Sequence, residues 1–466
     1  MTSLDIHLIG ICGTGMGSFA GLLQAAGHRV RGSDQNVYPP MSDKLRAWGI
    51  PVAEGYRPEN LEPRPDLVVV GNVVRRDNPE ARAAIDGGLE YTSFPEALGR
   101  LFLAERRSLV VAGTHGKTTT TSLLAWVLAQ GGHDPGLLVG GVPENFGEGF
   151  RLGRGETFVV EGDEYDTAFF DKRPKFLLYR PWLAVMTSLE YDHADIYPDV
   201  ETIEARFDDL SSLVPSSGRI LACASAPRVL ARRPRAKADW QTYAVGTEAQ
   251  WVGEKLETDG TGTRFSLLRE GTSLGELFLP MAGRHNVENA VAVAAIGLQE
   301  GLSLDEIREG FRTFKGIARR QTVRAEVDGI RIIDDFAHHP TAVSLTLDGL
   351  RARYGSEGRI FAIFEPRTAT SSRRYFQDAY AEAFEAADEV LIAPVGRAEL
   401  PSEERLDVVA LAAAISARGR PARAFDSLDA IVETLVASAR PGDSLVFMSN
   451  GGFGGIHATT EAALRG

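Results

Sequence analysis

The sequence predicts an α/β protein built from three domains. Three observations support this prediction: the chain has 466 residues, apolar strands alternate with helical segments along most of it, and glycine-rich or polar turns follow the strands. At about 150 residues per domain, this length corresponds to about three domains that each bury a core. We expect them at residues 1–106, 107–316 and 317–466, joined by short hinges.

The composition disfavours several classes of protein. Hydrophobic residues make up 44% and charged residues 24%, as in soluble globular proteins, and the net charge of −13 disfavours nucleic acid or an anionic membrane as a partner. We expect a cytoplasmic protein, because the sequence shows neither a basic signal-like start nor a run of about 18 apolar residues. Cys12 and Cys223 form no disulfide or metal-binding pattern.

The strongest functional signal is a glycine-framed loop in the expected central domain. An apolar strand runs into Gly113-Thr-His-Gly-Lys-Thr118, and a helix is expected directly afterwards. Gly113 and Gly116 let backbone N–H groups face a phosphate, Lys117 adds a positive charge, and Thr118 offers a hydroxyl to Mg²⁺. The loop is shorter than a standard Walker A motif. It predicts ATP or GTP use, with ATP preferred, over a plain strand–turn–helix connection.

The N-terminal domain is expected to be Rossmann-like. A strand at 5–11 leads into Gly10-Ile-Cys-Gly-Thr-Gly-Met-Gly17, and a helix is expected at 18–26. Asp34 follows the glycine turn at about 20 residues, where such domains place an acidic contact to a ribose hydroxyl. A dinucleotide fingerprint would need Gly or Ala where Ser18 stands. A nucleotide diphosphate therefore fits this loop better than a nicotinamide cofactor.

Two acidic clusters follow apolar runs in the central domain. The first contains Glu161, Asp163 and Asp166, and the second ends in His193. Both lie where ligands bind in an open α/β sheet, beyond the carboxyl ends of strands. Since Mg²⁺ prefers oxygen ligands and tolerates one imidazole, we expect Glu161 and His193 to join Thr118 as metal ligands. Asp163 and Asp166 taken alone fit helix caps or solvated turns better.

The remaining segments complete the fold prediction. Alternating strands at 240–245 and 263–279 make the central domain a P-loop ATPase-like unit with extra antiparallel strands. Asn286 and Asn289 open an Ala/Val-rich helix and suggest nucleotide contact, with a helix cap as the alternative for Asn286. The βαβ pattern recurs between residues 330 and 448 and predicts a second Rossmann-like domain.

The motifs together resemble the Mur ligase family across the whole chain. The residues that carry this resemblance are Gly113-Thr-His-Gly-Lys-Thr118, Glu161-Gly-Asp-Glu164, Asp192-His193, His285-Asn286-x-x-Asn289 and Asp334-Asp335-x-x-His338-His339-Pro340. Segments 36–42, 165–173 and 448–457 resemble those members that join a recycled murein tripeptide to UDP-N-acetylmuramate. Two alternatives remain: a member that uses L-alanine as acceptor, and a nucleotide-dependent oxidoreductase, which would leave the 113–118 loop unexplained.

The resemblance implies an ATP- and Mg²⁺-dependent ligase that works through an acyl phosphate, with Lys117, Glu161 and His193 as catalytic residues. It implies as acceptor the tripeptide L-alanyl-γ-D-glutamyl-meso-diaminopimelate, and we expect a monomer or weak homodimer. The implied ATP contacts are Gly113, Thr114, His115, Gly116, Lys117, Thr118, Thr119, Asn286, Asn289, Arg319, Arg320 and Asp335. The implied substrate contacts are Gly13, Thr14, Gly15, Met16, Gly17, Asp34, Gly71, Asn72, Asn145, His339 and Arg367.

Two sequence features refine these expectations. Arg367 follows a strand of the third domain, and its guanidinium is suited to pair with a carboxylate of the tripeptide. Several family members carry a carbamylated lysine shortly after the counterpart of His193, but no lysine stands between His193 and Ala236 here. Asp208 or Asp209 would supply that charge directly, or would lie on a solvated helix face.

Overall fold

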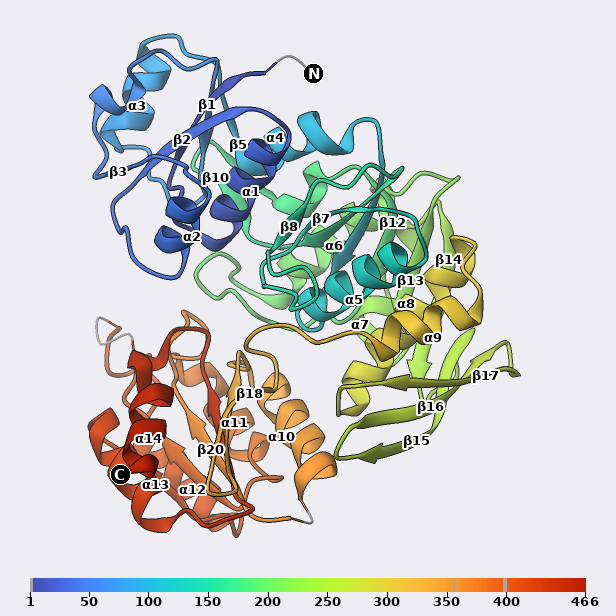
Figure 1. The fold of residues 1–466 in the computed structure, drawn as a ribbon, viewed down its shortest axis with the longest axis vertical. Coiled ribbons are helices and arrows are strands. Elements are labelled where there is room, and N and C mark those ends of the chain that lie inside the picture. The colour runs from blue at the N-terminus through green and yellow to red at the C-terminus, as the bar shows by residue number, and fades with distance from the viewer. Residues whose placement is uncertain (1–2, 356, 397–399) are drawn as a thin grey trace.

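The computed structural model describes residues 3–355, 357–396 and 400–466 and contains three α/β units, each with its own sheet (Figure 1). The chain runs from the N-terminal unit (blue) through the central unit (teal to yellow) to the C-terminal unit (orange to red). Within the described ranges, no helix is long and apolar enough to cross a membrane. The expected fold class, α/β in three units, is confirmed.

The N-terminal sheet is entirely parallel, in the order β3-β2-β1-β4-β5. The neighbours of β1 are β2 and β4, so the loop after β1 lies at the point where the strand order reverses, which is the usual ligand position in such sheets. The strands are β1 Asp5–Ile9, β2 Arg29–Asp34, β3 Val52–Glu54, β4 Leu67–Val70 and β5 Tyr91–Ser93, and the helices are α1 Thr14–Ala25, α2 Met41–Ala47, α3 Pro79–Asp86 and α4 Phe94–Leu98.

The central sheet has ten strands in the order β17-β16-β15-β14-β13-β12-β6-β9-β7-β8. Its middle is parallel, and β6 lies between β9 and β12. These strands are β6 Arg107–Ala112, β7 Gly136–Leu138, β8 Phe150–Arg151, β9 Thr157–Gly162, β12 Pro181–Met186, β13 Arg219–Cys223 and β14 Asp239–Val245. The helices include α5 Lys117–Gln130, α6 Val200–Leu213, α8 Arg284–Gln299 and α9 Leu304–Arg312.

Strands with antiparallel pairing extend one edge of this sheet, as expected. They are β15 Trp251–Asp259, which is parallel to β14, and then β16 Gly262–Arg269 and β17 Thr272–Leu279, which continue with antiparallel pairing. The expected strand at 263–279 is therefore two strands, because the chain turns at Glu270 and Gly271, which both have a positive φ. A separate hairpin, β10 Asp166–Ala168 and β11 Asp171–Pro174, follows the first acidic cluster.

The C-terminal sheet has the order β18-β19-β23-β20-β21-β22, and only its edge strand β18 is antiparallel. Its strands are β18 Thr322–Val327, β19 Ile330–Asp335, β20 Ile360–Phe364, β21 Glu389–Ile392, β22 Ala422–Ala424 and β23 Ser444–Met448. Its helices are α10 Pro340–Tyr354, α11 Gln377–Ala383, α12 Val408–Ala417, α13 Leu428–Ser438 and α14 Ile456–Arg465.

The first two units share a hydrophobic core, whereas the third has cores of its own. Phe102, just before β6, packs against Phe19 of α1 and Phe158 of β9 with ring centroids 6.1 and 6.4 Å apart. Phe150 of β8 packs on Trp48, which follows α2, at 5.2 Å. The expected boundaries at residues 106 and 317 fall in the connections between the three sheets and stay predictions.

Candidate nucleotide-binding site

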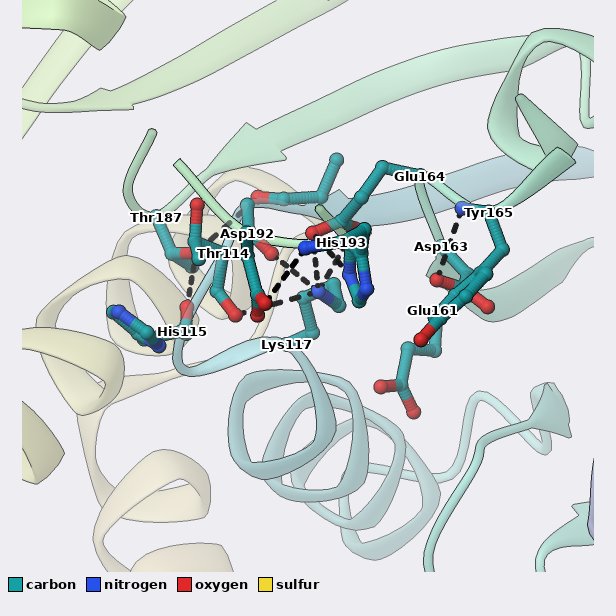
Figure 2. Close-up of polar contacts among 12 residues, drawn as sticks. Thr114, His115, Lys117, Glu161, Asp163, Glu164, Tyr165, Thr187, Asp192 and His193 are labelled. Atoms are coloured by element: carbon teal, nitrogen blue, oxygen red, sulfur yellow. Dashed lines mark hydrogen bonds and ion pairs between the residues drawn. The ribbon is translucent and has the colours of Figure 1, made fainter. Parts of the chain in front are cut away.

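The phosphate loop connects β6 to α5 and requires glycine at both ends. Gly113 has φ +142°, and a Cβ there would lie 2.1 Å from Thr187 Oγ1. Gly116 has φ +80°, and its Cβ would lie 2.7 Å from Asn289 Oδ1. Only glycine avoids both the strain and the clash. Because β6 lies between β9 and β12, side chains that follow those two strands surround the loop (Figure 2).

Lys117, the first residue of α5, forms a buried ion pair with Glu164. Its Nζ lies 2.8 Å from Glu164 Oε2 and donates to the carbonyl of Gly113 at 2.6 Å. The Glu164 side chain is only 2% exposed. Burial alone would lower the pKa of Lys117, but Glu164 and Asp163 outweigh it and raise the pKa, so the ammonium stays charged. Glu164 belongs to one of the family motifs, but no role was predicted for it.

Thr118 and Glu161 form a second contact beside the loop. Thr118 Oγ1 donates to Glu161 Oε1 at 2.9 Å, and the Gly140 N–H donates to Glu161 Oε2 at 2.7 Å. Burial raises the pKa of Glu161. A threonine hydroxyl at the start of the helix and a carboxylate after the adjacent strand form the donor set that holds Mg²⁺ in P-loop enzymes. The residues present therefore fit this ion.

His193 groups with Glu164 and Asp163, which lie beside it in Figure 2. Its Nε2 lies 3.4 Å from Glu164 Oε1, and His193, Glu164 and Asp163 bring three possible metal donors within 4.8 Å of one another. Asp163 also pairs with Lys175 at 2.8 Å. Burial would lower the pKa of His193, but Asp192 and Glu164 outweigh it and raise the pKa. The three predicted metal ligands thus fall into two groups.

Of the two alternatives for Asp208 and Asp209, the structure favours the helix face, because both carboxylates pair with arginines. Both residues lie on α6, whose buried face is formed mainly by apolar residues. Asp208 pairs with Arg232 at 3.3 Å, and Asp209, 47% exposed, pairs with Arg206 at 3.0 Å. Since α6 turns these carboxylates towards arginines of the same unit, Glu164 is the carboxylate that lies beside Lys117.

The glycine loop of the N-terminal unit lies at the carboxyl end of β1. Gly13 is the N-cap of α1, so Thr14, Gly15, Met16 and Gly17 form the first turn of the helix. Asp34, at the end of β2, accepts the N–H of Cys12 at 2.8 Å and of Asn36 at 3.0 Å. Asp34 thus fixes the shape of the loop. Gly71 and Asn72 directly follow β4, the other neighbour of β1.

Three asparagines that were predicted to contact the ligands make contacts with other parts of the protein. Asn286 is buried and donates to the carbonyl of Ala282 at 2.7 Å. Asn289 packs against Gly116 and thereby supports the phosphate loop. The Asn145 amide donates to the carbonyl of Thr313 and accepts the N–H of Lys315, both at 2.8 Å. These contacts hold Asn145, which lies between β7 and β8, against the linker to the third unit, and its predicted contact with the sugar stays a prediction.

A cavity of about 380 Å³ lies where the central unit meets this linker. Met281, Lys315, Ile317 and Arg320 are among the residues that line it. The neighbouring Arg319 points elsewhere and donates to the carbonyls of Ser449 and Gly451 at 2.7 and 2.6 Å. Two arginines were predicted to contact ATP. Within the part of the chain that the structure describes, Arg320 lines the cavity and Arg319 does not.

Asp335 of β19 lies close to this linker. Its carboxylate accepts the N–H of Gln321 and of Ala337, each at 2.8 Å. Burial raises the pKa of Asp335, although Arg320 opposes this shift. Asp335 therefore holds the start of β18 in place beside the cavity.

The predicted acceptor residues differ in exposure. Arg367 is exposed and lies over two glycines: a Cβ at Gly451 would be 2.1 Å from its Nη1, and one at Gly396 would be 3.0 Å from its Cγ. His339 is buried at the N-terminus of α10, where its Nδ1 accepts the N–H of Thr341 at 3.3 Å. Arg367 is free to meet a ligand from solvent, whereas His339 helps to hold the helix.

Comparison with known proteins agrees with a nucleotide-using enzyme of three α/β units. Family models match residues 5–106 (Mur ligase family, catalytic domain), 111–297 (Mur ligase middle domain) and 319–451 (Mur ligase, glutamate ligase domain). The chain is 40% identical, over 97% of both chains, to the UDP-N-acetylmuramate–L-alanyl-γ-D-glutamyl-meso-2,6-diaminoheptandioate ligase of Escherichia coli K12. It is 35% identical to a UDP-N-acetylmuramate–L-alanine ligase of Rhizobium etli, over 99% of this chain and 97% of the relative.

A solved structure is also similar. The murein peptide ligase of Psychrobacter arcticus matches with a TM-score of 0.73 and 35% identity over 99% of both chains. The fold and the phosphate loop thus define the class of ATP-dependent amide-bond ligases. The chain belongs to the Mur ligase family, and the resemblance carried by the sequence motifs is confirmed.

Proposed function

We propose that this enzyme joins the carboxylate of UDP-N-acetylmuramate to the amine of L-alanyl-γ-D-glutamyl-meso-diaminopimelate, with cleavage of ATP, during recycling of murein. The observation that carries this proposal is the 40% identity, over nearly the full length of both chains, to the Escherichia coli ligase of that name. The enzyme would act in the cytoplasm as a monomer or weak homodimer.

As the resemblance to the Mur ligase family implies, the reaction would have two steps, in the first of which a carboxylate is activated. In the first step, a carboxylate oxygen of the UDP-sugar attacks the γ-phosphorus of ATP, and ADP leaves. In the second, the peptide amine attacks the acyl carbon, loses a proton, and phosphate leaves. Lys117 would neutralise charge on the transferred phosphoryl group once the nucleotide displaces part of its contact with Glu164. No residue is assigned as the general base.

The nucleotide contacts divide between two units. The backbone N–H groups of the 113–119 loop would hold the phosphates, since they open the N-terminus of α5. The cavity lined by Arg320 would hold the rest of the nucleotide, beside the linker and Asp335. Thr118 and Glu161 would hold Mg²⁺, with His193 on a second ion, and bound Mg²⁺ would supply further neutralisation of phosphate charge.

The substrates would enter from the outer units. The glycine loop at the start of α1, with Asp34 and Gly71-Asn72, would bind the UDP group at the point where the strand order of the sheet reverses. In the third unit, exposed Arg367 would pair with a carboxylate of the tripeptide. Roles for Asn145 and His339 in substrate binding would require them to exchange the contacts they make in this structure.

A second candidate is the ligase that adds L-alanine to the same nucleotide. The 35% identity to the Rhizobium etli ligase favours keeping this candidate. The deciding experiment measures ADP release with ATP, Mg²⁺ and UDP-N-acetylmuramate in the presence of either the tripeptide or L-alanine. We expect kcat/KM for the tripeptide to exceed that for L-alanine by at least about a hundredfold, or about 2.7 kcal/mol. Preference for L-alanine would overturn the proposal.

A further inference from the structure

The segment that follows β12, residues 187–194, lies between the phosphate loop and the third unit. On the loop side, the carbonyl of Ser188 accepts the N–H of Thr114 at 3.2 Å, and its Oγ accepts the N–H of His115 at 2.8 Å. The N–H of Glu190 donates to Thr114 Oγ1 at 2.8 Å. Backbone and side-chain bonds therefore fix this segment to the phosphate loop.

One carboxylate oxygen of Glu190 reaches both sides of the interface. His115 Nε2, in the phosphate loop, lies 3.3 Å from Glu190 Oε2. Thr341 Oγ1, in the first turn of α10 of the third unit, donates to the same oxygen at 2.7 Å, and His339 Nδ1 lies 3.6 Å from it. The loop that would hold the phosphates and the unit that would hold the acceptor thus meet at one atom.

These side chains also offer the donor types of a metal site, but they already make contacts with one another and with Thr341. His339 Nδ1 accepts the N–H of Thr341, which leaves the proton on Nε2, and Nε2 donates to the carbonyl of Tyr191, each at 3.3 Å. Burial acts to raise the pKa of Glu190, but hydrogen bonds from His115 and Thr341 outweigh it and lower the pKa to about 2. The carboxylate is therefore charged at neutral pH and is a strong acceptor.

Two neighbouring residues make further contacts across the same interface. The ring of Tyr191 packs against Tyr375 with centroids 5.0 Å apart, and the N–H of Ala194 donates to Thr370 Oγ1 at 3.4 Å. Thr370 belongs to the same loop as Arg367. Glu190 thus sits in a segment that touches the ATP loop at one end and the predicted acceptor loop at the other.

We propose that Glu190 is a positioning residue that couples the phosphate loop to the third unit, so that the ATP and acceptor sites are assembled together. It touches neither reacting group and acts through His115 and Thr341. The inference rests on the proposed function only in that the third unit carries the acceptor. Weakening the coupling is expected to slow the reaction of the full complex while each substrate still binds.

A double-mutant cycle tests this coupling. Thr341→Val removes the hydroxyl at nearly constant volume, and Glu190→Gln removes the charge. We expect each substitution to lower kcat by at least about tenfold and the double variant to be no slower than the worse single variant by more than about twofold. The KM for UDP-N-acetylmuramate stays within about threefold, because its predicted site lies in the first unit. The assay uses whichever acceptor the wild type prefers, so its outcome does not depend on the tripeptide.

Two control variants separate coupling from a loss of folding. Thr341→Ser keeps the hydroxyl and should retain at least about half of the wild-type kcat. Glu204→Gln removes a carboxylate that pairs with Arg228 and Arg232 inside the central unit, and should leave kcat within about twofold. The proposal is overturned if Thr341→Val has wild-type kcat, if Thr341→Ser is as slow as Thr341→Val, or if the two single losses simply multiply in the double variant.

Discussion

The two glycine loops of this chain occupy the same position in their sheets but differ in charge. Each follows a parallel strand that lies between two others, and each opens the N-terminus of a helix. The N-terminal loop is held by Asp34 and offers mainly backbone N–H groups. The phosphate loop adds Lys117, which lies against Glu164, with Glu161 bonded to Thr118. The first arrangement suits a diphosphate that stays intact, and the second suits a phosphoryl group that is transferred.

The largest effect is expected where this charge is removed. Lys117→Ala should lower the rate of ADP formation by at least about a hundredfold, or about 2.7 kcal/mol, because no other cation replaces it in the loop. Calorimetric titration should give a Kd for UDP-N-acetylmuramate within about twofold of the wild type, since that site lies in another unit. A variant that keeps more than about a tenth of the wild-type kcat would remove Lys117 from the proposed mechanism.

The backbone of the two loops can be compared with a matched pair of alanine variants. Gly113→Ala places a Cβ 2.1 Å from Thr187 Oγ1 at a positive φ, whereas at Gly13 the nearest atom is the carbonyl of Gly10 at 3.7 Å. We expect Gly113→Ala to lower kcat/KM for ATP about thirtyfold, or about 2 kcal/mol, and Gly13→Ala to leave it within about twofold. Steady-state kinetics with varied ATP checks both. Equal effects would mean that the two loops do not differ in rigidity.

The acceptor site extends the comparison to the third unit. Arg367→Ala should raise the KM for the tripeptide at least tenfold, about 1.4 kcal/mol, because an exposed guanidinium partner for a carboxylate is lost. Initial rates should show the KM values for ATP and UDP-N-acetylmuramate within about twofold of the wild type. Impairment for ATP of the same size would move acceptor recognition away from this loop, with residues 450–455 as the next segment to test.

For one change, the removal of CO₂, we expect no effect on the rate. Removal of CO₂ and bicarbonate should leave kcat unchanged, because no lysine stands between His193 and Ala236 to be carbamylated, while Glu164 supplies a permanent carboxylate beside Lys117. Degassed buffers with and without added bicarbonate provide the measurement. A rate that falls on degassing and recovers with bicarbonate would show that another lysine is modified.

Local sequence signals were sufficient for much of the fold. The sequence predicts strands at 67–70, 360–364 and 444–448, and the structure has these limits, because each is a fully buried and mainly apolar run. The strand β15 was not predicted, since the exposed residues Glu254, Lys255 and Glu257 interrupt its apolar pattern. The sequence also predicts a helix at 375–387, but α11 is shorter and spans Gln377–Ala383.

The candidate site likewise contains contacts that the sequence could predict and contacts that it could not. The contact between Thr118 and Glu161 follows from a motif and the order of neighbouring strands, so sequence could indicate it. The pairing of Lys117 with Glu164 depends on how the chain turns after β9, and the hydrogen bond between Glu190 and Thr341 depends on the docking of two units. No periodicity or spacing in the sequence encodes those distances. Glu164 and Glu190 belong to the two acidic clusters, but nothing in the sequence distinguishes them from the other acidic residues there.

The aromatic core shared by the first two units has a mechanical consequence. Since Phe102 and Phe158 join these units through buried rings, we expect them to turn as one rigid body, with the third unit as the only moving arm. The pivot would be the linker, where Arg319 and Gln321 both adopt positive φ, at 63° and 51°. A protease should therefore nick the chain near this pivot long before it separates the first unit from the second.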